Sequence, residues 1–232
     1  MTGSTVRPPA YQQLADELRA DITSGRLRPG ERLPPEPELC VKIGVSRSTV
    51  REALRLLASQ HLIVTTRGVT GGSFVAHPDA SQLADGLSTG FALLAHSNDV
   101  GLIDLLELRR ALEVPAAGLA AVRRTDADLF ELREAYFDPV NDDLDTMLAQ
   151  HSVFHRALAR ATGNPLFELV GRPLYHASYG EDVFAGLPEG YWSRIDADHR
   201  ALVDCLAARD AESATRTAAQ HLDYIALAAA SR

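Results

Sequence analysis

The sequence has little of what secreted, disulfide-stabilised or membrane-spanning proteins contain. Its 232 residues include only two cysteines, Cys40 and Cys205, far apart in the chain. A disulfide between them is not expected, and a reducing compartment suits them better. No apolar run approaches the roughly 18 residues that a membrane-spanning helix needs, and the first residues show no basic cluster followed by an apolar stretch. These absences predict a cytoplasmic protein with no membrane partner.

Motifs typical of enzymes are also missing. The sequence contains no nucleophile elbow, no P-loop and no dinucleotide-binding glycine pattern. Between His151 and His155 lie only Ser, Val and Phe, so the general-base Glu of HExxH enzymes has no counterpart. We therefore expect a protein that is not an enzyme. The alternative is a metal-dependent hydrolase that carries a DNA-binding domain.

Negative charge dominates the chain as a whole but not its N-terminal part. The formal net charge of −8 argues, taken alone, against a nucleic-acid partner. Residues 1–77, however, contain 10 Lys and Arg against 7 Asp and Glu, a net of +3. Residues 78–232 contain 13 against 24, a net of −11. This distribution predicts that the N-terminal part contacts phosphates and that the acidic part discourages indiscriminate binding.

The apolar periodicity of the N-terminal part predicts three helices followed by a β-hairpin. Leu14 and Leu18 are spaced four apart and mark the first helix. Gly44 ends the second helix, and a glycine-rich turn separates two short strands. The expected ranges are 10–24, 36–43 and 47–60 for the helices and 63–66 and 73–76 for the strands. This order is that of a winged helix-turn-helix domain, which we place at residues 7–77.

The third of these helices has the features of a DNA-reading helix. Ser46 is expected to cap its N-terminus, and its apolar residues between Val50 and Leu57 share one face. The exposed N-terminal end can then enter the major groove, where hydroxyls bind phosphates and an arginine contacts guanine. Arg67, in the hairpin turn, is placed to reach the minor groove or the DNA backbone. The alternative is an ordinary surface helix with scattered charges. The residues at the exposed end are Arg47, Ser48, Thr49 and Arg51.

Residues 11–77 closely resemble the DNA-binding domain of GntR-family transcription regulators. They contain GERLPPEPELCVKIGVSRSTVREALRLLASQHLIVTTRGVTGGSFV. The family pattern is approximately G-x-x-LPSERELA-x-x-x-GVSR-x-x-VREAL, followed by a G-x-G-x-x-V wing. The resemblance implies contacts with double-stranded operator DNA, with Gly71 or Gly72 in the wing. The operator contacts it implies within the helix are Ser46, Arg47, Ser48, Thr49 and Arg51.

The sequence departs from this family at the start of the second helix. Pro35 and Pro37 stand where the family has the Ser and Arg of SERELA. The missing Arg removes an expected DNA contact, and Pro35 lacks the hydroxyl of an N-cap, although proline is tolerated in a first helical turn. We expect an altered or weaker operator preference, not a loss of binding.

After a linker at residues 77–79, nearly every segment is expected to be helical. The expected ranges are 80–95, 101–123, 126–137, 142–162, 166–179, 191–208 and 210–230. Pro115 is expected to bend the second of these helices, and Pro173 to interrupt the fifth. With the N-terminal domain, the prediction is a mainly α protein.

Two segments in this part resemble the FCD ligand-binding domain of the FadR-like subfamily. They are LIDLLELRRALEVPAAGLAA, within residues 101–123, and GNPLF at 163–167. The resemblance extends over residues 80–230. It implies an all-α antiparallel helical bundle that surrounds a polar cavity and also forms a homodimer.

Four histidines are expected to converge inside this bundle. His151 and His155 are four residues apart and project from one face of a helix. His199 and His221 lie at similar distances before and after the turn near residues 209–210, so an antiparallel pair of helices places them at similar heights. Four imidazoles suit a divalent transition metal, with zinc or nickel first. The alternative for each histidine is an ordinary buried or rim residue.

The FCD resemblance bears on this metal site. Metal-binding members carry an Asp-x-x-x-His pair followed by two further histidines. His155, His199 and His221 match the three histidines, but His151 stands at the aspartate position. Two alternatives stay open: His151 replaces the carboxylate, or three histidines bind the metal together with ligand and water. Loss of the carboxylate is expected to weaken binding of hard cations.

A small carboxylate effector is expected beside this site. Arg109, in ELRRALE, matches the family arginine that faces the cavity, and a buried arginine needs an anionic partner. One alternative is a structural salt bridge to Glu107, Glu113 or another acid. Another is that Arg110 faces the cavity in place of Arg109, if the helix phase differs. Asn164 and Arg172 are further effector-binding candidates, and Asn164 is also a candidate helix cap before Pro165.

The function expected from the sequence is that of a ligand-responsive transcription regulator. We expect a repressor that binds a palindromic operator as a homodimer and is released by a small organic acid. The alternative in the binding class is a DNA-binding protein whose helical domain only dimerises.

Overall fold

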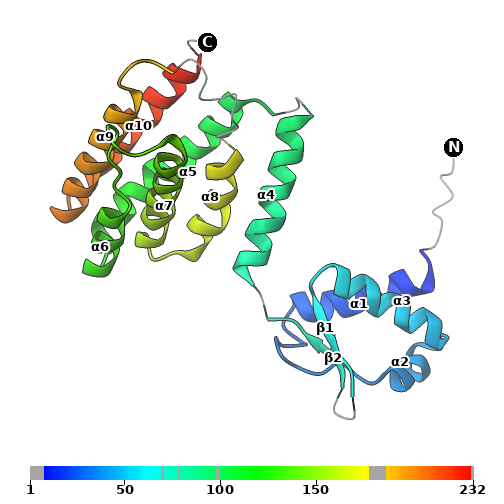
Figure 1. Cartoon of the computed structure of the whole chain (residues 1–232). Coiled ribbons are helices and arrows are strands. Elements are labelled where there is room, and N and C mark those ends of the chain that lie inside the picture. The colour runs from blue at the N-terminus through cyan, green and yellow to red at the C-terminus, as the bar shows by residue number, and fades with distance from the viewer. Residues whose placement is uncertain (1–7, 69–70, 78, 98–99, 178–186, 231–232) are drawn as a thin grey trace, which may run out of the picture. The chain divides into compact units, whose positions relative to one another are not determined.

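The computed structural model describes residues 8–68, 71–77, 79–97, 100–177 and 187–230. The chain divides into two compact units, Met1–Asp79 and Ala80–Arg232, and each is described by itself (Figure 1). Within the described residues the structure consists of helices and a single two-stranded sheet. The predicted fold class, mainly α with a hairpin wing followed by a helical bundle, is confirmed.

The first unit is a winged helix-turn-helix. Its elements are α1 (Ala10–Thr23), α2 (Glu36–Ile43), α3 (Arg47–Ser59), β1 (Ile63–Thr66) and β2 (Gly72–Val75). The strands are antiparallel, and Ile63 pairs with Val75. Both side chains are buried against Leu14, Leu39 and Val50, so the hairpin closes the core made by the three helices. Strand β2 begins one residue earlier than predicted.

Local chemistry fixes the helix-turn-helix at both sides of its turn. Gly44 adopts a left-handed conformation, with φ of 71°, and ends α2. The Oγ of Ser46 accepts a hydrogen bond from the backbone N–H of Thr49, 3.2 Å away, which confirms the predicted N-cap of α3. At the other end of α2, Pro35 holds the N-cap position without a side-chain cap.

The second unit contains seven helices among its described residues. They are α4 (Ala80–His96), α5 (Leu102–Arg123), α6 (Asp126–Glu134), α7 (Leu144–Ala161), α8 (Pro165–Ala177), α9 (Tyr191–Ala207) and α10 (Ala211–Ala230). Helix α7 begins two residues later than predicted because the carboxylate of Asp143 accepts the N–H of Thr146 at 2.8 Å. None of the described helices is both long and apolar enough to cross a membrane.

One prediction about these helices is wrong. Helix α8 continues through Pro173 and is not interrupted there. A proline removes one backbone donor, and the packing of α8 against α4 and α7 offsets that loss. Pro115 lies inside α5, and the bend expected there stays a prediction. The segment 180–190, between the helices expected at 166–179 and 191–208, lies largely outside the described residues.

Helix α5 is the centre of the second unit. It packs against α7, α8 and α9 and most extensively against α10. Ala117, Ala120 and Ala121 are fully buried, and small residues of this kind let helices approach closely. At Gly118 the approach is closer still, because a Cβ there would lie 2.6 Å from the Oγ1 of Thr215 on α10. The chain thereby brings the inner faces of α7, α9 and α10 around α5.

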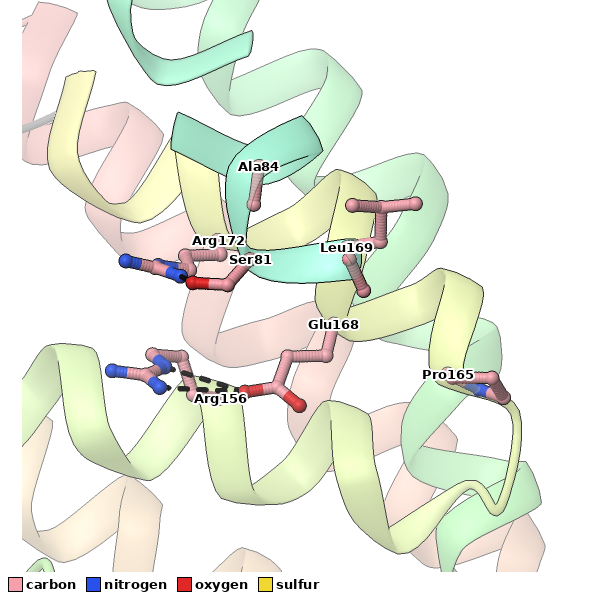
Figure 2. A pocket seen from close by; sticks show the side chains of 8 residues that line it. Ser81, Ala84, Arg156, Pro165, Glu168, Leu169 and Arg172 are labelled. Atoms are coloured by element: carbon pink, nitrogen blue, oxygen red, sulfur yellow. Dashed lines mark hydrogen bonds and ion pairs between the residues drawn. The ribbon is translucent and has the colours of Figure 1, made fainter. Parts of the chain in front are cut away.

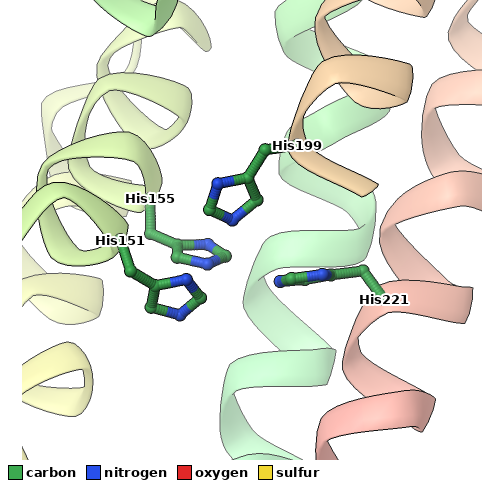
Figure 3. Close-up of side chains that lie close together, drawn as sticks. All are labelled: His151, His155, His199 and His221. Atoms are coloured by element: carbon green, nitrogen blue, oxygen red, sulfur yellow. The ribbon is translucent and has the colours of Figure 1, made fainter. Parts of the chain in front are cut away.

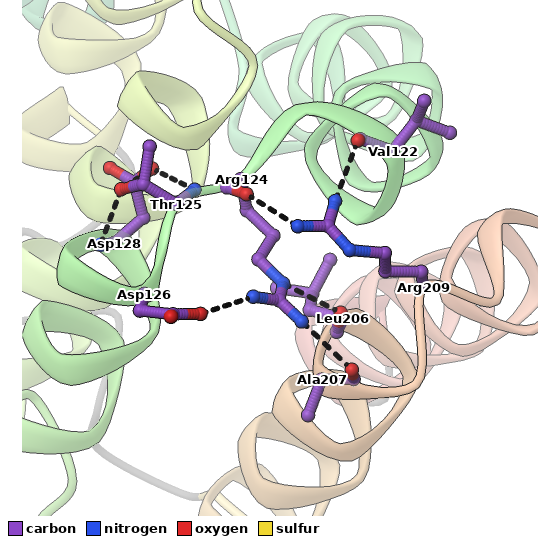
Figure 4. Close-up of polar contacts among 8 residues, drawn as sticks. All are labelled: Val122, Arg124, Thr125, Asp126, Asp128, Leu206, Ala207 and Arg209. Atoms are coloured by element: carbon purple, nitrogen blue, oxygen red, sulfur yellow. Dashed lines mark hydrogen bonds and ion pairs between the residues drawn. The ribbon is translucent and has the colours of Figure 1, made fainter.

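Two arginines join the helix ends at one side of this unit (Figure 4). Arg124 donates to the carbonyl oxygens of Leu206 and Ala207, at 3.1 and 2.9 Å, at the C-terminus of α9. Arg209 donates in return to the carbonyl oxygens of Val122 and Arg124, at 2.8 and 3.3 Å, at the C-terminus of α5. Each guanidinium supplies donors for carbonyl groups that have no partner within their own helix. The pair fixes α9 relative to α5.

We expect Arg124→Ala to lower the free energy of unfolding of the second unit by about 2–4 kcal/mol, because two helix-end carbonyls lose a charged donor. Denaturant unfolding followed by circular dichroism measures this. The matched control is Arg216→Ala, which removes an exposed i, i+4 pair with Glu212 and is expected to cost about 0.5 kcal/mol or less. Equal stability of the two variants would contradict the capping role of Arg124.

Candidate functional site

The DNA-reading residues predicted from the sequence lie on an exposed surface of the first unit. Arg47, Ser48 and Arg51 are exposed at the N-terminal end of α3, and Thr49 is half-buried beside them. The Oγ atoms of Ser46 and Ser48 lie 2.7 Å apart. The amphipathic α3 therefore turns its polar end outward while its apolar face fills the core.

Arg51 has a partner that the sequence did not indicate. Its Nε donates to the Glu36 carboxylate at the start of α2, 3.0 Å away, while 63% of the Arg51 side chain stays exposed. Glu36 orients the guanidinium and leaves part of its donor edge exposed. Nothing in the helical periodicity signals this contact, because the two residues lie on different helices.

Gly71 in the wing is needed for steric reasons, whereas Gly72 lies against a side chain that can move. A Cβ at Gly71 would lie 2.6 Å from the carbonyl oxygen of Thr66, and one at Gly72 would lie 2.8 Å from the Nε of Arg32. Arg32 also donates to the carbonyl oxygen of Gly71 at 2.5 Å and supports the wing. Arg67 is exposed on the wing. Residues 69–70 of the predicted turn lie outside the described residues.

The second candidate site is a cluster of four buried histidines (Figure 3). His151 and His155 project from α7, His199 from α9 and His221 from α10, and all four rings point toward one another. Each of the four residues is 3% exposed or less. The structure therefore brings together the four histidines that the sequence predicted, His151 among them.

The geometry of the cluster fits a single metal ion. One ring nitrogen from each histidine lies within 4.8 Å of the others. Around an ion bound at about 2.0–2.1 Å, opposite nitrogens are separated by up to about 4.2 Å, so small ring rotations complete a coordination shell. Both ring nitrogens of His199 and the Nε2 atoms of His155 and His221 are buried without a hydrogen-bond partner among the described residues. Such orphaned nitrogens are costly, and a metal ion satisfies them.

Two carboxylates stand behind the histidines. An oxygen of Glu113, on α5, lies 2.5 Å from the Nδ1 of His155, and an oxygen of Asp198 lies 3.4 Å from the Nδ1 of His221. A carboxylate at Nδ1 fixes the ring orientation and leaves Nε2 as the ligand atom. The ring of His199 has another support, since it stacks on Phe154 with centroids 3.8 Å apart.

The electrostatics of the cluster keep three of its rings, those of His151, His155 and His199, neutral. Burial lowers the pKa of His155 to about 4, although Glu113 opposes this shift. Burial and the neighbouring histidines hold the pKa of His151 and His199 well below the ordinary value of 6.5. Burial raises the pKa of the Glu113 carboxyl, but Arg109 and His155 lower it more, so Glu113 is ionised. Neutral imidazoles are the form that binds a metal.

Arg109 is completely buried next to this cluster. Its Nε donates to Glu113 at 2.7 Å, and its guanidinium lies over the ring of Tyr175, 5.4 Å from the centroid. Arg109, Glu113 and His155 thus form a continuous chain of contacts. The salt bridge considered from the sequence is present, and Glu113 is its partner.

The other two effector candidates lie elsewhere. Asn164 stands at the start of α8, where its Oδ1 accepts the N–H of Leu166 at 3.1 Å, as a helix cap does. Arg172 lines a cavity shared by α4, α7 and α8, and none of the four histidines lines that cavity. The structure does not bring these residues together with Arg109.

The sequence did not predict that Glu113 contacts His155, or that Asp198 belongs to the metal site. Glu113 carried a partial signal, because it lies four residues after Arg109 on one helix. Asp198 carried none, since an acidic residue next to a histidine in sequence is common. Both contacts depend on how α5, α9 and α10 pack.

An exposed recognition helix with a wing, in one chain with a helical domain, defines a DNA-binding transcription regulator. Residues 10–75 match the family described as bacterial regulatory proteins, gntR family. Residues 104–224 match the FCD domain. The chain belongs to the GntR family of transcription regulators and carries an FCD domain.

Similar proteins agree with this assignment. The putative L-lactate dehydrogenase operon regulatory protein of Escherichia coli strain K12 is 29% identical over 225 residues, 92% of this chain and 83% of that protein. The HTH-type transcriptional regulator LutR of Bacillus subtilis strain 168 is 36% identical over 149 residues, 63% of this chain and 65% of LutR. Among solved structures, Streptococcus agalactiae GntR has the same fold, with a TM-score of 0.59 at 24% identity over 94% of this chain and 99% of that one. These relatives are regulators and not enzymes, as predicted.

Proposed function

We propose that this protein is a metal-containing, ligand-responsive repressor that acts in the cytoplasm. In this proposal residues 7–77 bind a palindromic operator and residues 80–230 form the dimer and hold the metal and effector. The observation that carries it is the buried cluster of four histidines in a chain that also exposes a recognition helix. The metal links effector binding to the packing of the helical domain.

The donor set points to a borderline transition metal. His151, His155, His199 and His221 supply only imidazole nitrogens, which suit Zn²⁺, Ni²⁺ or Co²⁺ better than Mg²⁺ or Ca²⁺. Zinc and nickel are our first candidates. When bound, the ion supplies a Lewis-acidic point of attachment for an oxygen of the effector. Glu113 and Asp198 hold two of the rings in the orientation that binding requires.

The effector that we propose is a small carboxylate. Arg109 already contacts an internal carboxylate, that of Glu113, at 2.7 Å. An effector carboxylate that takes the place of Glu113 at Arg109 also frees the Nδ1 side of His155, so both contacts change together. The relative from Escherichia coli is named for an L-lactate dehydrogenase operon, which makes L-lactate and other small hydroxy acids the first compounds to test.

Dimerisation through the second unit is supported by an exposed apolar stripe on α4. Leu83, Leu87 and Leu94 are 54, 41 and 42% exposed, and their spacing places them on one face of the helix. A second copy of the chain covers such a stripe symmetrically, as a two-fold operator requires. In the effector-free dimer the two DNA-binding units have the spacing that the operator requires. Effector binding changes that spacing and so releases the DNA.

The experiment that tests this function starts from operators selected out of random duplex DNA by the full chain. We expect the selected sites to be palindromic and bound by a dimer, measured by fluorescence anisotropy with sedimentation analysis. L-lactate or a related acid is expected to weaken binding to the metal-loaded protein. A selected site that is bound equally with and without every carboxylate tested would support the alternative that the helical domain only dimerises.

We expect Arg51→Ala to lower the affinity for the selected operator about 10- to 100-fold, because one bidentate base contact contributes about 1–3 kcal/mol. The fold should be unchanged, since the side chain is largely exposed. Arg26→Ala, which removes another exposed ion pair of the first unit, is the control. An unchanged affinity of Arg51→Ala would contradict the assignment of α3 as the recognition helix.

A further inference from the structure

A cavity of about 240 Å³ lies between α4, α7 and α8, apart from the histidine cluster (Figure 2). The residues that line it include Ser81, Ala84, Arg156, Glu168, Leu169 and Arg172. Its lining shares no residue with the histidine cluster or with Arg109. The cavity is smaller than the usual range for drug-sized ligands, roughly 300–1,000 Å³. Its size suits a ligand of only a few heavy atoms.

Two arginines, Arg156 and Arg172, and one acid, Glu168, are among the residues that line this cavity. Arg156 and Arg160 both donate to a single oxygen of Glu168, at the long distances of 3.4 and 3.3 Å. Arg160 has a closer partner in Glu131, at 2.8 Å. The carboxylate of Glu168 is therefore loosely shared, and the Arg156 guanidinium at the cavity wall keeps donor capacity for a further anion.

Arg172 on the opposite wall leaves a buried donor without a partner. Its Nη1 donates to the Oγ of Ser81 at 3.2 Å and its Nη2 lies 2.9 Å from Asp85. Its Nε is buried and has no hydrogen-bond partner among the described residues. A buried N–H of a charged group left unmatched is unfavourable, so this nitrogen indicates an absent acceptor. Figure 2 shows the guanidinium groups of Arg156 and Arg172 extending to the same side of the cavity.

We propose that this cavity binds a small oxyanion, a carboxylate or a phosphate, between Arg156 and Arg172. The anion accepts from the orphaned Nε of Arg172 and from the Arg156 guanidinium, and the first turn of α4 adds the positive end of a helix dipole. Ala84 and Leu169 supply the apolar part of the lining. The site is separate from the metal centre and does not depend on it.

The site joins the start of α4 to two other helices of the second unit. Ser81 belongs to the first turn of α4, which follows directly on the segment between the two units, whereas Arg156 and Arg172 belong to α7 and α8. An anion that bridges these residues ties the start of α4 to the rest of the helical domain. Binding thus stabilises the packing of α4 on the rest of the helical domain.

Isothermal titration of the full-length protein with inorganic phosphate and, separately, with succinate tests the site. We expect at least one of the two to bind, and the stronger of them identifies the source of the oxyanion. Arg172→Gln and Arg156→Gln are each expected to weaken that binding at least 10-fold, because each removes one of two charged donors. Circular dichroism of each variant checks that it folds, and Arg172→Lys retains the charge if Arg172→Gln does not fold.

Two controls separate this site from the metal centre. Arg110→Gln, which removes an exposed arginine paired with Asp223, should bind the anion as the wild type does. His155→Ala/His199→Ala should also bind the anion, whether or not the wild type binds a metal at the histidine cluster. The proposal is overturned if neither anion binds, if Arg172→Gln and Arg156→Gln bind as tightly as the wild type, or if the histidine variant alone loses binding.

Discussion

Adding zinc to the metal-free protein is expected to raise the melting temperature of the helical domain by about 8–16 °C. A ligand that binds only the folded state contributes about 4 kcal/mol when its free concentration is 1,000 times its dissociation constant. For a domain of this size each kcal/mol shifts the melting temperature by about 2–4 °C. Four nitrogens within 4.8 Å of one another, each on a buried ring, provide the site. Differential scanning calorimetry measures the shift.

The controls for this experiment come from the same chain. His155→Ala/His199→Ala should show no zinc-dependent shift, because it lacks ligands from α7 and α9. His61→Asn should behave as the wild type, since His61 is an exposed residue of the DNA-binding unit with φ of 57°, which asparagine tolerates. The transition of the DNA-binding unit should not move with zinc. An equal shift in the double-alanine variant would contradict the site.

Glu113→Ala is expected to lower the free energy of unfolding by about 3–5 kcal/mol, because it leaves the charge of Arg109 buried without its carboxylate partner. Arg109 is fully buried, and its Nε donates to Glu113 at 2.7 Å. The same variant should bind zinc about 10- to 100-fold more weakly, since His155 loses the contact that orients its ring. Denaturant unfolding and a competitive zinc titration measure the two effects.

A second substitution separates the two roles of Glu113. Arg109→Met/Glu113→Ala removes the buried charge together with its partner and should recover much of the lost stability without recovering zinc affinity. The control is Asp223→Ala, which breaks the exposed ion pair between Arg110 and Asp223, whose side chains are 46 and 57% exposed. It is expected to lower the free energy of unfolding by about 1 kcal/mol or less. If Glu113→Ala were as stable as the wild type, the buried contact between Arg109 and Glu113 would not contribute to the stability of the fold.

The sequence predicted those features that follow from local periodicity and capping. The apolar spacing placed nearly every helix, and Ser46 and Gly44 marked the ends of the helix-turn-helix turn. The four histidines could be placed on three helices because the i, i+4 spacing and the turn near residue 209 fix their faces and heights. Convergence in space then required only that α7, α9 and α10 pack around a common centre, which the structure shows.

Contacts between helices distant in sequence were beyond prediction. The partner of Arg51 is on α2, that of His221 is on α9, and the cavity beside Arg172 depends on how α4 lies against α8. Side-chain spacing along one helix carries no information on these distances. The prediction that α8 is interrupted at Pro173 was wrong for the same reason, because tertiary packing outweighed the local cost of the proline.

The metal content of the untagged protein tests the central proposal most directly. Inductively coupled plasma mass spectrometry of the wild type beside His155→Ala/His199→Ala measures it, before and after reconstitution with zinc or nickel. We predict about one transition metal ion per wild-type chain, as four ligands to one ion require, and none in the variant. A wild type that holds no metal even after reconstitution would contradict the metal site and would return the four histidines to a packing role.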